Sequence, residues 1–230
     1  MKHQIIIFSG AGMSAESGIK TFRDSNGLWE NYDINEVATP EAWEANPDLV
    51  SKFYNQRRKQ IIESTPNEAH YAIAEMQKLA DVRVITQNID DLHERAGSEN
   101  VMHLHGNIRY AKSSGPNQEK EYYPIQGECL TKNDTCPEGF RLRPHVVWFG
   151  EAVPMMEKAV EMIMEATHFV VIGSSLQVYP AANLLGYCPT NAKKWIIDPK
   201  ANDMENPYEF TLINQKAVEG INTLVKQLKL

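Results

Sequence analysis

A glycine-rich turn follows the first apolar run of the chain. The pattern G-x-G-x-x-G/A matches residues 10–15, GAGMSA, directly after the apolar residues 5–8. Glycines in such a turn let the backbone approach a pyrophosphate, whose charge then lies at the N-terminus of the next helix. The same turn also occurs without a ligand, so by itself it leaves a phosphate site and a plain tight turn open.

The stretch beyond this turn departs from the pattern of a dehydrogenase. A dinucleotide-binding domain usually places an acidic residue at the end of a second strand about 20 residues further on. Residues 22–32 read FRDSNGLWENY, and their Gly, Asn and Asp predict a loop instead. We expect this loop, with Phe22 and Arg23, to lie over a bound cofactor. A surface loop around a buried Trp29 is the alternative.

Polar or small residues follow three other predicted strands. Gln87, Asn88 and Asp90 follow one of them, the turn 173–175, GSS, follows another, and Asp198 follows a third. Ligands of open α/β sheets bind beyond the carboxyl ends of the strands, so these groups are suited to ribose hydroxyls or a carboxamide. Helix caps at Asn88 and Asp90, and tight turns at the other two places, are the alternatives.

Two histidines, His103 and His105, are two residues apart on a predicted extended segment, so their side chains point to the same face. A metal pair would need a third ligand, and none has suitable spacing. A single imidazole acting as general base is the simpler proposal, because its ordinary pKa lies near neutral pH. A structural histidine is the alternative.

Tyr54 and Arg57 are three residues apart in a predicted helix and therefore share one face. A hydroxyl and a guanidinium placed together can bind a carboxylate. The alternative is a packed tyrosine beside a solvated charge.

The composition narrows the class of protein. The chain has 230 residues, of which 42% are hydrophobic and 23% charged, with a net charge of −7, so we expect a globular protein that binds no nucleic acid. The apolar run at residues 5–8 is far shorter than the roughly 20 residues of a membrane span. We therefore expect a cytoplasmic protein without membrane contact and, because no feature indicates an oligomer, a monomer. Three cysteines argue against a disulfide framework.

Short apolar runs alternate with segments of helical spacing, which predicts an α/β fold with a Rossmann-like parallel sheet. The runs are residues 5–8, 82–85, 169–172 and 195–197. We assign to the sheet domain residues 1–35, 82–109 and 141–230. A smaller domain then combines an inserted helical module, residues 36–81, with a loop-rich module, residues 110–140. In the helical module, Thr39 and Thr65 each precede a proline and predict helix starts, and Glu68 completes a capping box with Thr65.

Together these segments resemble the sirtuins, which are NAD-dependent protein lysine deacylases. The resemblance extends along nearly the whole chain and rests on several motifs in one order. The motifs are GAGMSAESGI at residues 10–19 with Phe22 and Arg23, TQNID at 86–90, HLHG at 103–106, RPHVVWFGE at 143–151 and GSS at 173–175.

The resemblance implies a role for each matching residue. It implies that His105 is the catalytic base. It implies that NAD is held by Gly10, Ala11, Gly12, Ser14, Phe22, Arg23, Gln87, Asn88, Ile89, Asp90, Gly173, Ser174, Ser175 and Asp198. It also implies that a substrate peptide is added as a strand along Val146, Val147, Trp148, Phe149 and Gly150. The family's usual Gly-Thr-Ser turn is Gly-Ser-Ser here, and its usual asparagine near the adenosine ribose is Asp198.

The implied reaction moves the acyl group of a protein lysine to the ribose of NAD, giving nicotinamide and O-acyl-ADP-ribose. His105 helps deprotonate a ribose hydroxyl. Tyr54 and Arg57 resemble the pair of class III sirtuins, which remove succinyl and malonyl groups, so we expect these groups and acetyl as substrates. Two other activities stay open, an ADP-ribosyltransferase or NAD glycohydrolase of the same fold, and a non-catalytic NAD-sensing module.

The cysteines depart from the family pattern. Most sirtuins hold a structural zinc with two C-x-x-C pairs in the region that matches residues 110–140. That region here contains only Cys129 and Cys136, without a C-x-x-C, while Cys188 and His145 lie outside it. Structural zinc needs four nitrogen or sulfur ligands. We therefore predict no metal ligands and no zinc.

Overall fold

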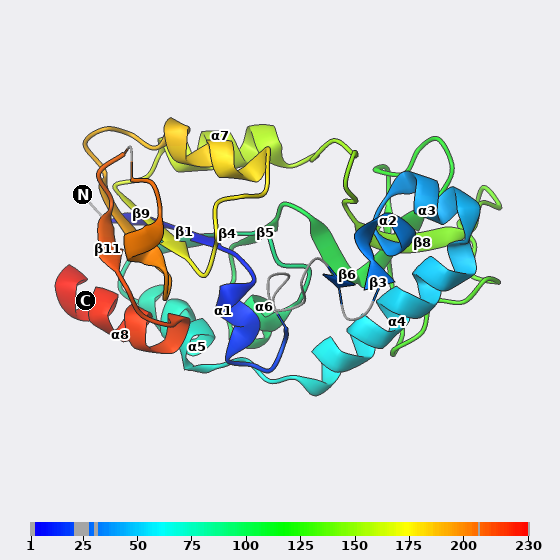
Figure 1. Cartoon of the computed structure of the whole chain (residues 1–230), viewed down its shortest axis with the longest axis horizontal. Coiled ribbons are helices and arrows are strands. Elements are labelled where there is room, and N and C mark those ends of the chain that lie inside the picture. The colour runs from blue at the N-terminus through cyan, green and yellow to red at the C-terminus, as the bar shows by residue number, and fades with distance from the viewer. Residues whose placement is uncertain (1–2, 21–27, 30–31, 207, 230) are drawn as a thin grey trace.

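The computed structural model describes residues 3–20, 28–29, 32–206 and 208–229, and it has two lobes that lie end to end (Figure 1). The larger lobe contains a six-stranded parallel sheet in the order β11-β10-β9-β1-β4-β5. Its strands are β1 (Gln4–Ser9), β4 (Asp81–Thr86), β5 (Val101–His103), β9 (His168–Ile172), β10 (Lys193–Ile197) and β11 (Thr211–Ile213). All four predicted apolar runs lie in this sheet, and the predicted Rossmann-like fold is confirmed.

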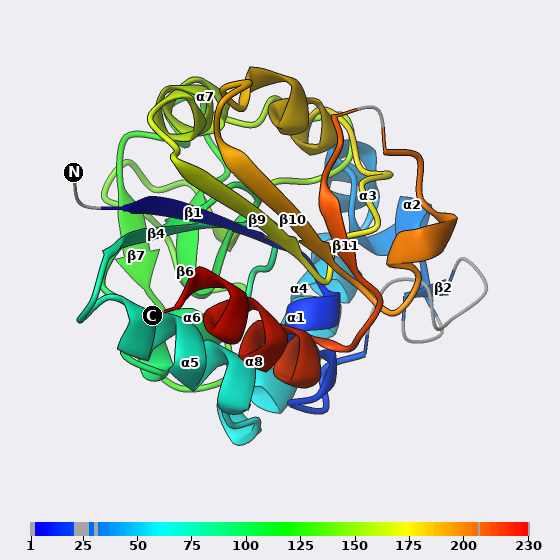
Figure 2. The same cartoon turned by 90° about the vertical axis from the view of Figure 1, so that its left-hand side faces the viewer.

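The parallel sheet is buried on both faces, which explains why its strands are continuously apolar. In β1, Ile5 and Ile7 pack into one core, while Ile6 and Phe8 pack into the other. The first face is covered by α1 (Gly12–Ala15), α5 (Glu68–Met76) and α8 (Ala217–Leu228). The second is covered by α7 (Met156–Met164) and two 3₁₀ helices, η1 (Ala181–Tyr187) and η2 (Ala201–Asp203). Figure 2 shows α5 and α8 on one side of the sheet and α7 on the other.

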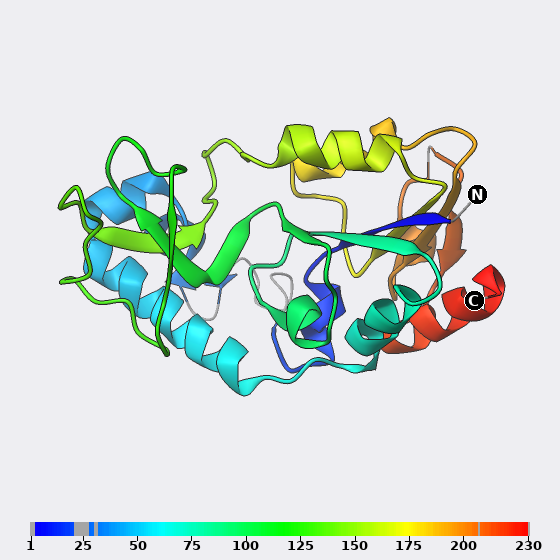
Figure 3. The ribbon, with the colours of Figure 1, turned by 180° about the vertical axis from the view of Figure 1, so that it is seen from behind.

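The smaller lobe combines a three-stranded antiparallel sheet with helices (Figure 3). The sheet has the order β7-β6-β8, formed by β6 (Gly106–Ser113), β7 (Tyr122–Pro124) and β8 (Leu142–Val146). The rest of the lobe comprises α2 (Ile34–Val37), α3 (Pro40–Ala45), α4 (Pro47–Glu63) and the short strands β2 (Leu28–Trp29) and β3 (Tyr32–Asp33). Phe53 and Tyr54 of α4 share a core with Ile108 of β6 and Val146 of β8.

The boundary between the lobes differs from the predicted one. Residues 36–81 are predicted as one helical module, but α5 packs on the parallel sheet and against α8. Residues 141–230 are predicted in the sheet domain, but β8 belongs to the small sheet. The small sheet also includes residues 106–109, which begin β6. The physical reason is that apolar spacing identifies the face that is buried but not which of two cores covers it.

Helix capping is predicted correctly at one of two places. Thr39 caps α3, since its hydroxyl accepts the Ala42 N–H at 3.0 Å. At α5, which begins beside α6 (Leu92–Arg95), the N-cap is Asn67 rather than Thr65. Asparagine is among the strongest N-cap residues, so the helix starts after Asn67, two residues later than predicted.

His70 completes the cap of α5 and is fully buried. Its Nδ1 accepts the Asn67 N–H at 3.3 Å, so this nitrogen carries no proton. Burial lowers the pKa of His70 to about 4. The folded protein therefore keeps His70 neutral at a pH where the unfolded chain binds a proton.

Within the residues that the structure describes, none of the helices has both the length and the apolar character needed to cross a bilayer.

We predict that acid destabilises the fold partly through His70. The unfolding free energy is expected to be fully retained above about pH 6.5 and to fall as the pH drops towards 4, because the unfolded state gains the proton first. His70→Gln keeps an acceptor but cannot titrate, so it should remove up to roughly 3 kcal/mol of that fall. Urea unfolding between pH 4 and 8 measures this, with His3→Gln at an exposed position as control. The same pH slope in His70→Gln and wild type would contradict the prediction.

Candidate functional site

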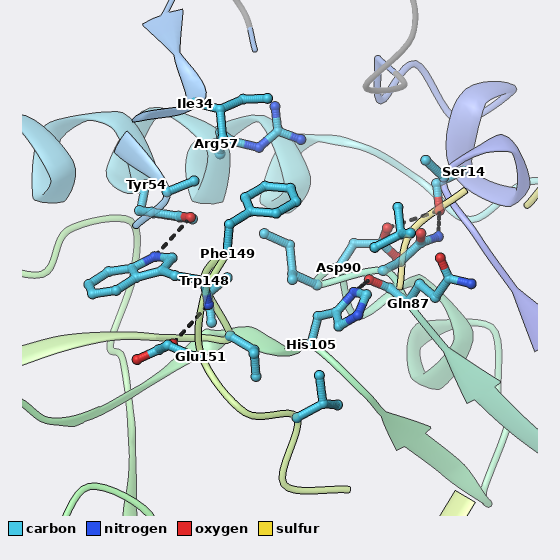
Figure 4. Close-up of a pocket in the computed structure, with 18 of the residues that line it drawn as sticks. Ser14, Ile34, Tyr54, Arg57, Gln87, Asp90, His105, Trp148, Phe149 and Glu151 are labelled. Atoms are coloured by element: carbon cyan, nitrogen blue, oxygen red, sulfur yellow. Dashed lines mark hydrogen bonds between the residues drawn. The ribbon is translucent and has the colours of Figure 1, made fainter. Parts of the chain in front are cut away.

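A pocket of about 380 Å³ opens where the carboxyl ends of the parallel strands face the smaller lobe (Figure 4). Most of the predicted site residues come together here. Those that line the pocket are Ala11, Ser14, Tyr54, Arg57, Gln87, Asn88, Ile89, Asp90, His105, Val146, Val147, Trp148, Phe149 and Gly150. One pocket thus joins the end of the parallel sheet to side chains of the small lobe.

The remaining predicted residues are not among those that line this pocket. Gly10, Gly12, Gly173, Ser174, Ser175 and Asp198 do not line it. Asp198 Oδ1 accepts the Lys200 N–H at 2.9 Å, which is the tight-turn alternative considered from the sequence. Phe22 and Arg23 lie outside the described residues.

The glycine-rich turn packs directly on the turn after β9. The Gly12 N–H donates to the Gly173 carbonyl at 2.8 Å, and the Gly10 N–H donates to the Ile172 carbonyl at 3.0 Å. A Cβ on Gly12 would lie 2.7 Å from Gly173 Cα. Gly173 has φ +61°, and a Cβ there would lie 2.3 Å from the Met13 nitrogen. Only glycine allows these two backbones to approach so closely.

A buried polar cluster joins this turn to the loop after β4. The Ser14 hydroxyl donates to Asp90 Oδ2 at 2.9 Å. Asn88 Nδ2 donates to the Gly10 carbonyl and to Ser14 Oγ, both at 3.1 Å. Burial raises the pKa of Asp90, and the Ser14 hydrogen bond opposes that rise. The amide and carboxylate that the sequence places after β4 are therefore fixed by bonds to the first turn.

Asp90 also agrees in part with the alternative prediction, that it caps a helix. Its Oδ1 accepts the Leu92 N–H at 3.2 Å, at the start of α6. Gln87 joins a second pair of strand ends, because its Nε2 donates to Ser174 Oγ at 3.1 Å. The loops after β1, β4 and β9 are thus connected through side chains that point towards the pocket side of the sheet.

His105 has the geometry of a neutral base. Its Nδ1 lies 3.0 Å from the Gln87 carbonyl. A carbonyl only accepts hydrogen bonds, so Nδ1 carries the proton and Nε2 is the basic nitrogen. Burial lowers the pKa of His105, and the bond to Gln87 opposes this only in part. Figure 4 shows the ring in the pocket. An unprotonated imidazole at neutral pH can accept a proton from a bound hydroxyl.

Tyr54 and Arg57 lie on one face of α4, as predicted, and both are buried. The Tyr54 hydroxyl accepts the Trp148 Nε1–H at 3.1 Å, and burial raises the pKa of Tyr54. Figure 4 shows Tyr54 and Arg57 projecting from α4 at the opposite end of the pocket from Ser14. A guanidinium thus lies in the same pocket as the His105 imidazole.

In the predicted peptide-binding segment, residues 146–150, several backbone N–H groups are bonded to other parts of this chain. The Val147 N–H donates to the His105 carbonyl at 2.9 Å and the Phe149 N–H to the Ala38 carbonyl at 3.0 Å. The Trp148 N–H donates to Glu151 Oε2 at 2.8 Å. These three N–H groups therefore already have partners within the chain, and the bond between Val147 and His105 joins this segment to the histidine.

Sequence reasoning missed several residues of the pocket. They are Ile19, Lys20, Ile34, Ala38, Ile61, Glu151, Val153, Val178, Tyr179 and Pro180. Glu151 could have been found, because it ends the RPHVVWFGE motif, and its carboxylate bonds both Trp148 N–H and Arg143. Apolar residues such as Ile34 and Ile61 carry no signal, because in a sequence they resemble ordinary core positions.

The loop-rich module does not fit a four-ligand zinc site. Cys129 is exposed, whereas Cys136 is buried with its Sγ 3.4 Å from Ser113 Oγ. Among the described residues, no three His, Cys, Asp or Glu side chains are grouped so that they could hold a metal ion. The absence of zinc stays a prediction from the cysteine count, and none of the chemistry below depends on a metal.

We predict that Gly173→Ala destabilises the protein and weakens nucleotide binding, because the methyl group would overlap the Met13 backbone. Gly139→Ala is the matched control, since Gly139 also has a positive φ, +85°, but nothing lies within 4 Å of its Cβ position. The backbone strain is common to both, at about 1–2 kcal/mol, so the excess loss in Gly173→Ala measures the overlap. Equal unfolding free energies of the two variants would contradict this account.

Comparison with known proteins agrees with this geometry. The Sir2 family profile matches residues 10–180. An NAD-dependent protein deacylase of Bacteroides thetaiotaomicron is 48% identical over 228 residues, which cover 97% of each chain. One of Helicobacter pylori is 47% identical over 225 residues, covering 97% of this chain and 96% of that protein.

Solved structures give the same result. A mutant Sir2 homologue in complex with ADP-ribose superposes with a TM-score of 0.86 at 37% identity, covering 99% of this chain and 92% of that one. A Sir2 homologue in complex with NAD has a TM-score of 0.85 at 37% identity, covering 99% and 90%. The chain therefore belongs to the Sir2 family, the sirtuins.

Proposed function

We propose that this chain, an NAD-dependent protein-lysine deacylase of the sirtuin type, removes succinyl, malonyl and acetyl groups from lysine side chains and yields nicotinamide and O-acyl-ADP-ribose. The observation that carries the proposal is that Arg57 and His105 line one pocket. The imidazole supplies a base at one part of this pocket, and the guanidinium supplies a positive charge at another.

NAD supplies the ribose that receives the acyl group and the nicotinamide that leaves. Asn88 with Asp90 would form the nicotinamide pocket, and Ala11, Gly12, Ser14 and Arg23 would hold the phosphates and the nicotinamide ribose. From the family resemblance, Phe22 would cover the reacting sugar. Gln87 binds a ribose hydroxyl beside His105. Asp198 would lie near the adenosine ribose, and Gly10, Ile89, Gly173, Ser174 and Ser175 would complete the NAD site. The buried cluster of Ser14, Asn88 and Asp90 supports this assignment, because its polar groups are fixed before any ligand binds.

His105 takes the proton of the ribose hydroxyl through Nε2. The Gln87 carbonyl orients the ring, because it accepts from Nδ1 and so leaves the basic nitrogen for the substrate. Burial favours the neutral form, so the base is available at neutral pH without first losing a proton.

Arg57 binds the terminal carboxylate of a succinyl or malonyl group. Its side chain is 4% exposed and comes from the small lobe, so a carboxylate bonded to it would also be shielded from water. Charge-assisted hydrogen bonds of this kind are stronger than neutral ones. An acetyl group has no carboxylate and would bind without this contact. With a net chain charge of −7, long-range attraction does not favour acidic acyl groups, so the preference must come from this local contact.

We predict that His105→Ala retains NAD binding but loses deacylation by about 10²- to 10⁴-fold, the usual contribution of a general base. Calorimetric titration of NAD and mass spectrometry of the NAD product check both parts. His3→Ala, at an exposed histidine, is the control. Wild-type turnover of an acyl-peptide by His105→Ala would exclude the proposed base. Free ADP-ribose or an ADP-ribosylated protein as product of the wild type would favour the glycohydrolase or transferase alternative.

We predict that Arg57→Met lowers kcat/KM for succinyl- and malonyl-peptides by about 10- to 100-fold, as expected for a lost hydrogen bond to a charged group. Activity on an acetyl-peptide should change by much less, because that substrate has no partner for the guanidinium. Lys52→Met removes a positive charge from the exposed side of the same helix and serves as control. Equal succinyl-peptide KM values for wild type and Arg57→Met would rule out the assignment.

A further inference from the structure

A second histidine, His103, bonds the backbone of the loop that follows β4. His103 is the last residue of β5, and its Nδ1 lies 3.0 Å from the Asn88 carbonyl. His105 makes the same bond to the preceding carbonyl, that of Gln87. Two histidines, spaced so that they point to one side, therefore hold two consecutive carbonyls. The loop cannot shift relative to β5 unless these bonds break.

The partners of His103 determine its charge. The carbonyl of Asn88 faces Nδ1, and Glu94 Oε1 of α6 lies 2.6 Å from Nε2. Both groups accept hydrogen bonds, so each ring nitrogen must carry a proton for both bonds to exist. The Asn107 amide nitrogen also lies 3.3 Å from Nε2 and could donate only to an unprotonated Nε2, but the Glu94 carboxylate is nearer, at 2.6 Å, and charged, which favours the proton on Nε2. His103 is thus an imidazolium, whereas His105 is neutral.

The surrounding charges agree with this assignment. Burial acts to lower the pKa of His103, but the hydrogen bond and charge of Glu94 outweigh it and, with Asp90 on the loop, raise the pKa. On the other sides, His93 and His145 have lowered pKa values, caused mainly by burial and partly by the charge on His103. The side chain of His103 is 11% exposed and that of Glu94 is 38% exposed, so the pair is shielded from water on the histidine side.

Asn88 connects His103 to the pocket, because its backbone and its side chain bond different groups. Its carbonyl is bonded by His103, while its side chain bonds the Gly10 carbonyl and Ser14 Oγ. Ser14 in turn donates to Asp90. Losing the bond from His103 would therefore loosen the group of side chains that the proposed function assigns to nicotinamide.

We infer that His103, charged by its contact with Glu94, is a positioning residue that holds residues 88–90 in the conformation that binds the nicotinamide end of NAD, and that NAD affinity falls when this pair is discharged. The inference rests on the proposed role of Asn88 and Asp90. A neutral imidazole can donate from one nitrogen only, so one of the two bonds is lost when His103 loses its proton.

The test compares Glu94→Gln with wild type. Glutamine keeps an acceptor oxygen but removes the charge that keeps His103 protonated. Calorimetry should show NAD binding about 3- to 10-fold weaker in Glu94→Gln at pH 8, the size of one net hydrogen bond. ADP-ribose, which lacks nicotinamide, should bind both proteins equally. Glu99→Gln, a change of the same charge at an exposed position after α6, is the matched control.

Two further measurements make the test decisive. The His103 ring, followed by NMR between pH 5.5 and 9.5, should lose its proton at a lower pH in Glu94→Gln than in wild type. His103→Gln should bind NAD weakly at every pH. Inhibition of its deacylation by added nicotinamide should weaken by a similar factor. Its KM for the acyl-peptide should change little. Thermal unfolding of each variant confirms that it is folded.

Each outcome separates this inference from the proposed function. If Glu94→Gln binds NAD as Glu99→Gln does and its His103 titration is unchanged, the inference is wrong even if the enzyme desuccinylates peptides. If NAD and ADP-ribose weaken equally, the pair supports the whole fold rather than the nicotinamide end, and the inference is again overturned. If Glu94→Gln loses NAD affinity and lowers the pH of the His103 titration, but the products are not O-acyl-ADP-ribose, the proposed function fails and the positioning role remains.

Discussion

The pairing of β1 with two neighbours in matched register is the constraint on which the site depends. Ser9, the last residue of β1, lies opposite Thr86 of β4 on one side and Ile172 of β9 on the other. Three strands therefore end at the same level, and the three loops that follow them must share one small volume. Glycines at the first and third loops make that possible, because a Cβ on either would overlap the other backbone.

This crowding turns polar residues into a preorganised surface. Asn88 and Ser14 bond each other and the backbone of the first turn, and Gln87 bonds Ser174 across the sheet. Such groups lose little freedom when a ligand binds, because the fold has already ordered them. The loops after the parallel strands thus provide Ser14, Gln87, Asn88 and Asp90 at one side of the pocket.

The small lobe provides the opposite side by a different kind of packing. Trp148 lies at its centre, with its indole N–H bonded to Tyr54, its ring 3.9 Å from the Arg143 guanidinium and 5.8 Å from the Trp43 ring. These contacts fix Trp148 in the segment of residues 146–150. The same segment bonds the His105 carbonyl through the Val147 N–H. Aromatic and cationic contacts in the small lobe therefore set where Tyr54 and Trp148 lie relative to His105.

The sequence by itself determined the features that depend on neighbours within a few residues. Continuous apolar runs predicted four strands, Thr39 before a proline predicted a helix start, and the ordered motifs identified the family and placed His105 and Arg57 among the site residues. These signals are local, since strand periodicity, capping and turns involve residues at most a few positions apart. Only the tertiary structure decided the rest. It placed α5 on the parallel sheet, moved β8 into the small lobe and chose Asn67 over Thr65 as cap. It also gave His103 a charge, because Glu94 and Asn88, 9 and 15 residues away, meet it from two sides. A sequence pattern shows which side chains can bury or bond, whereas the partner that each one meets is set by how whole elements pack.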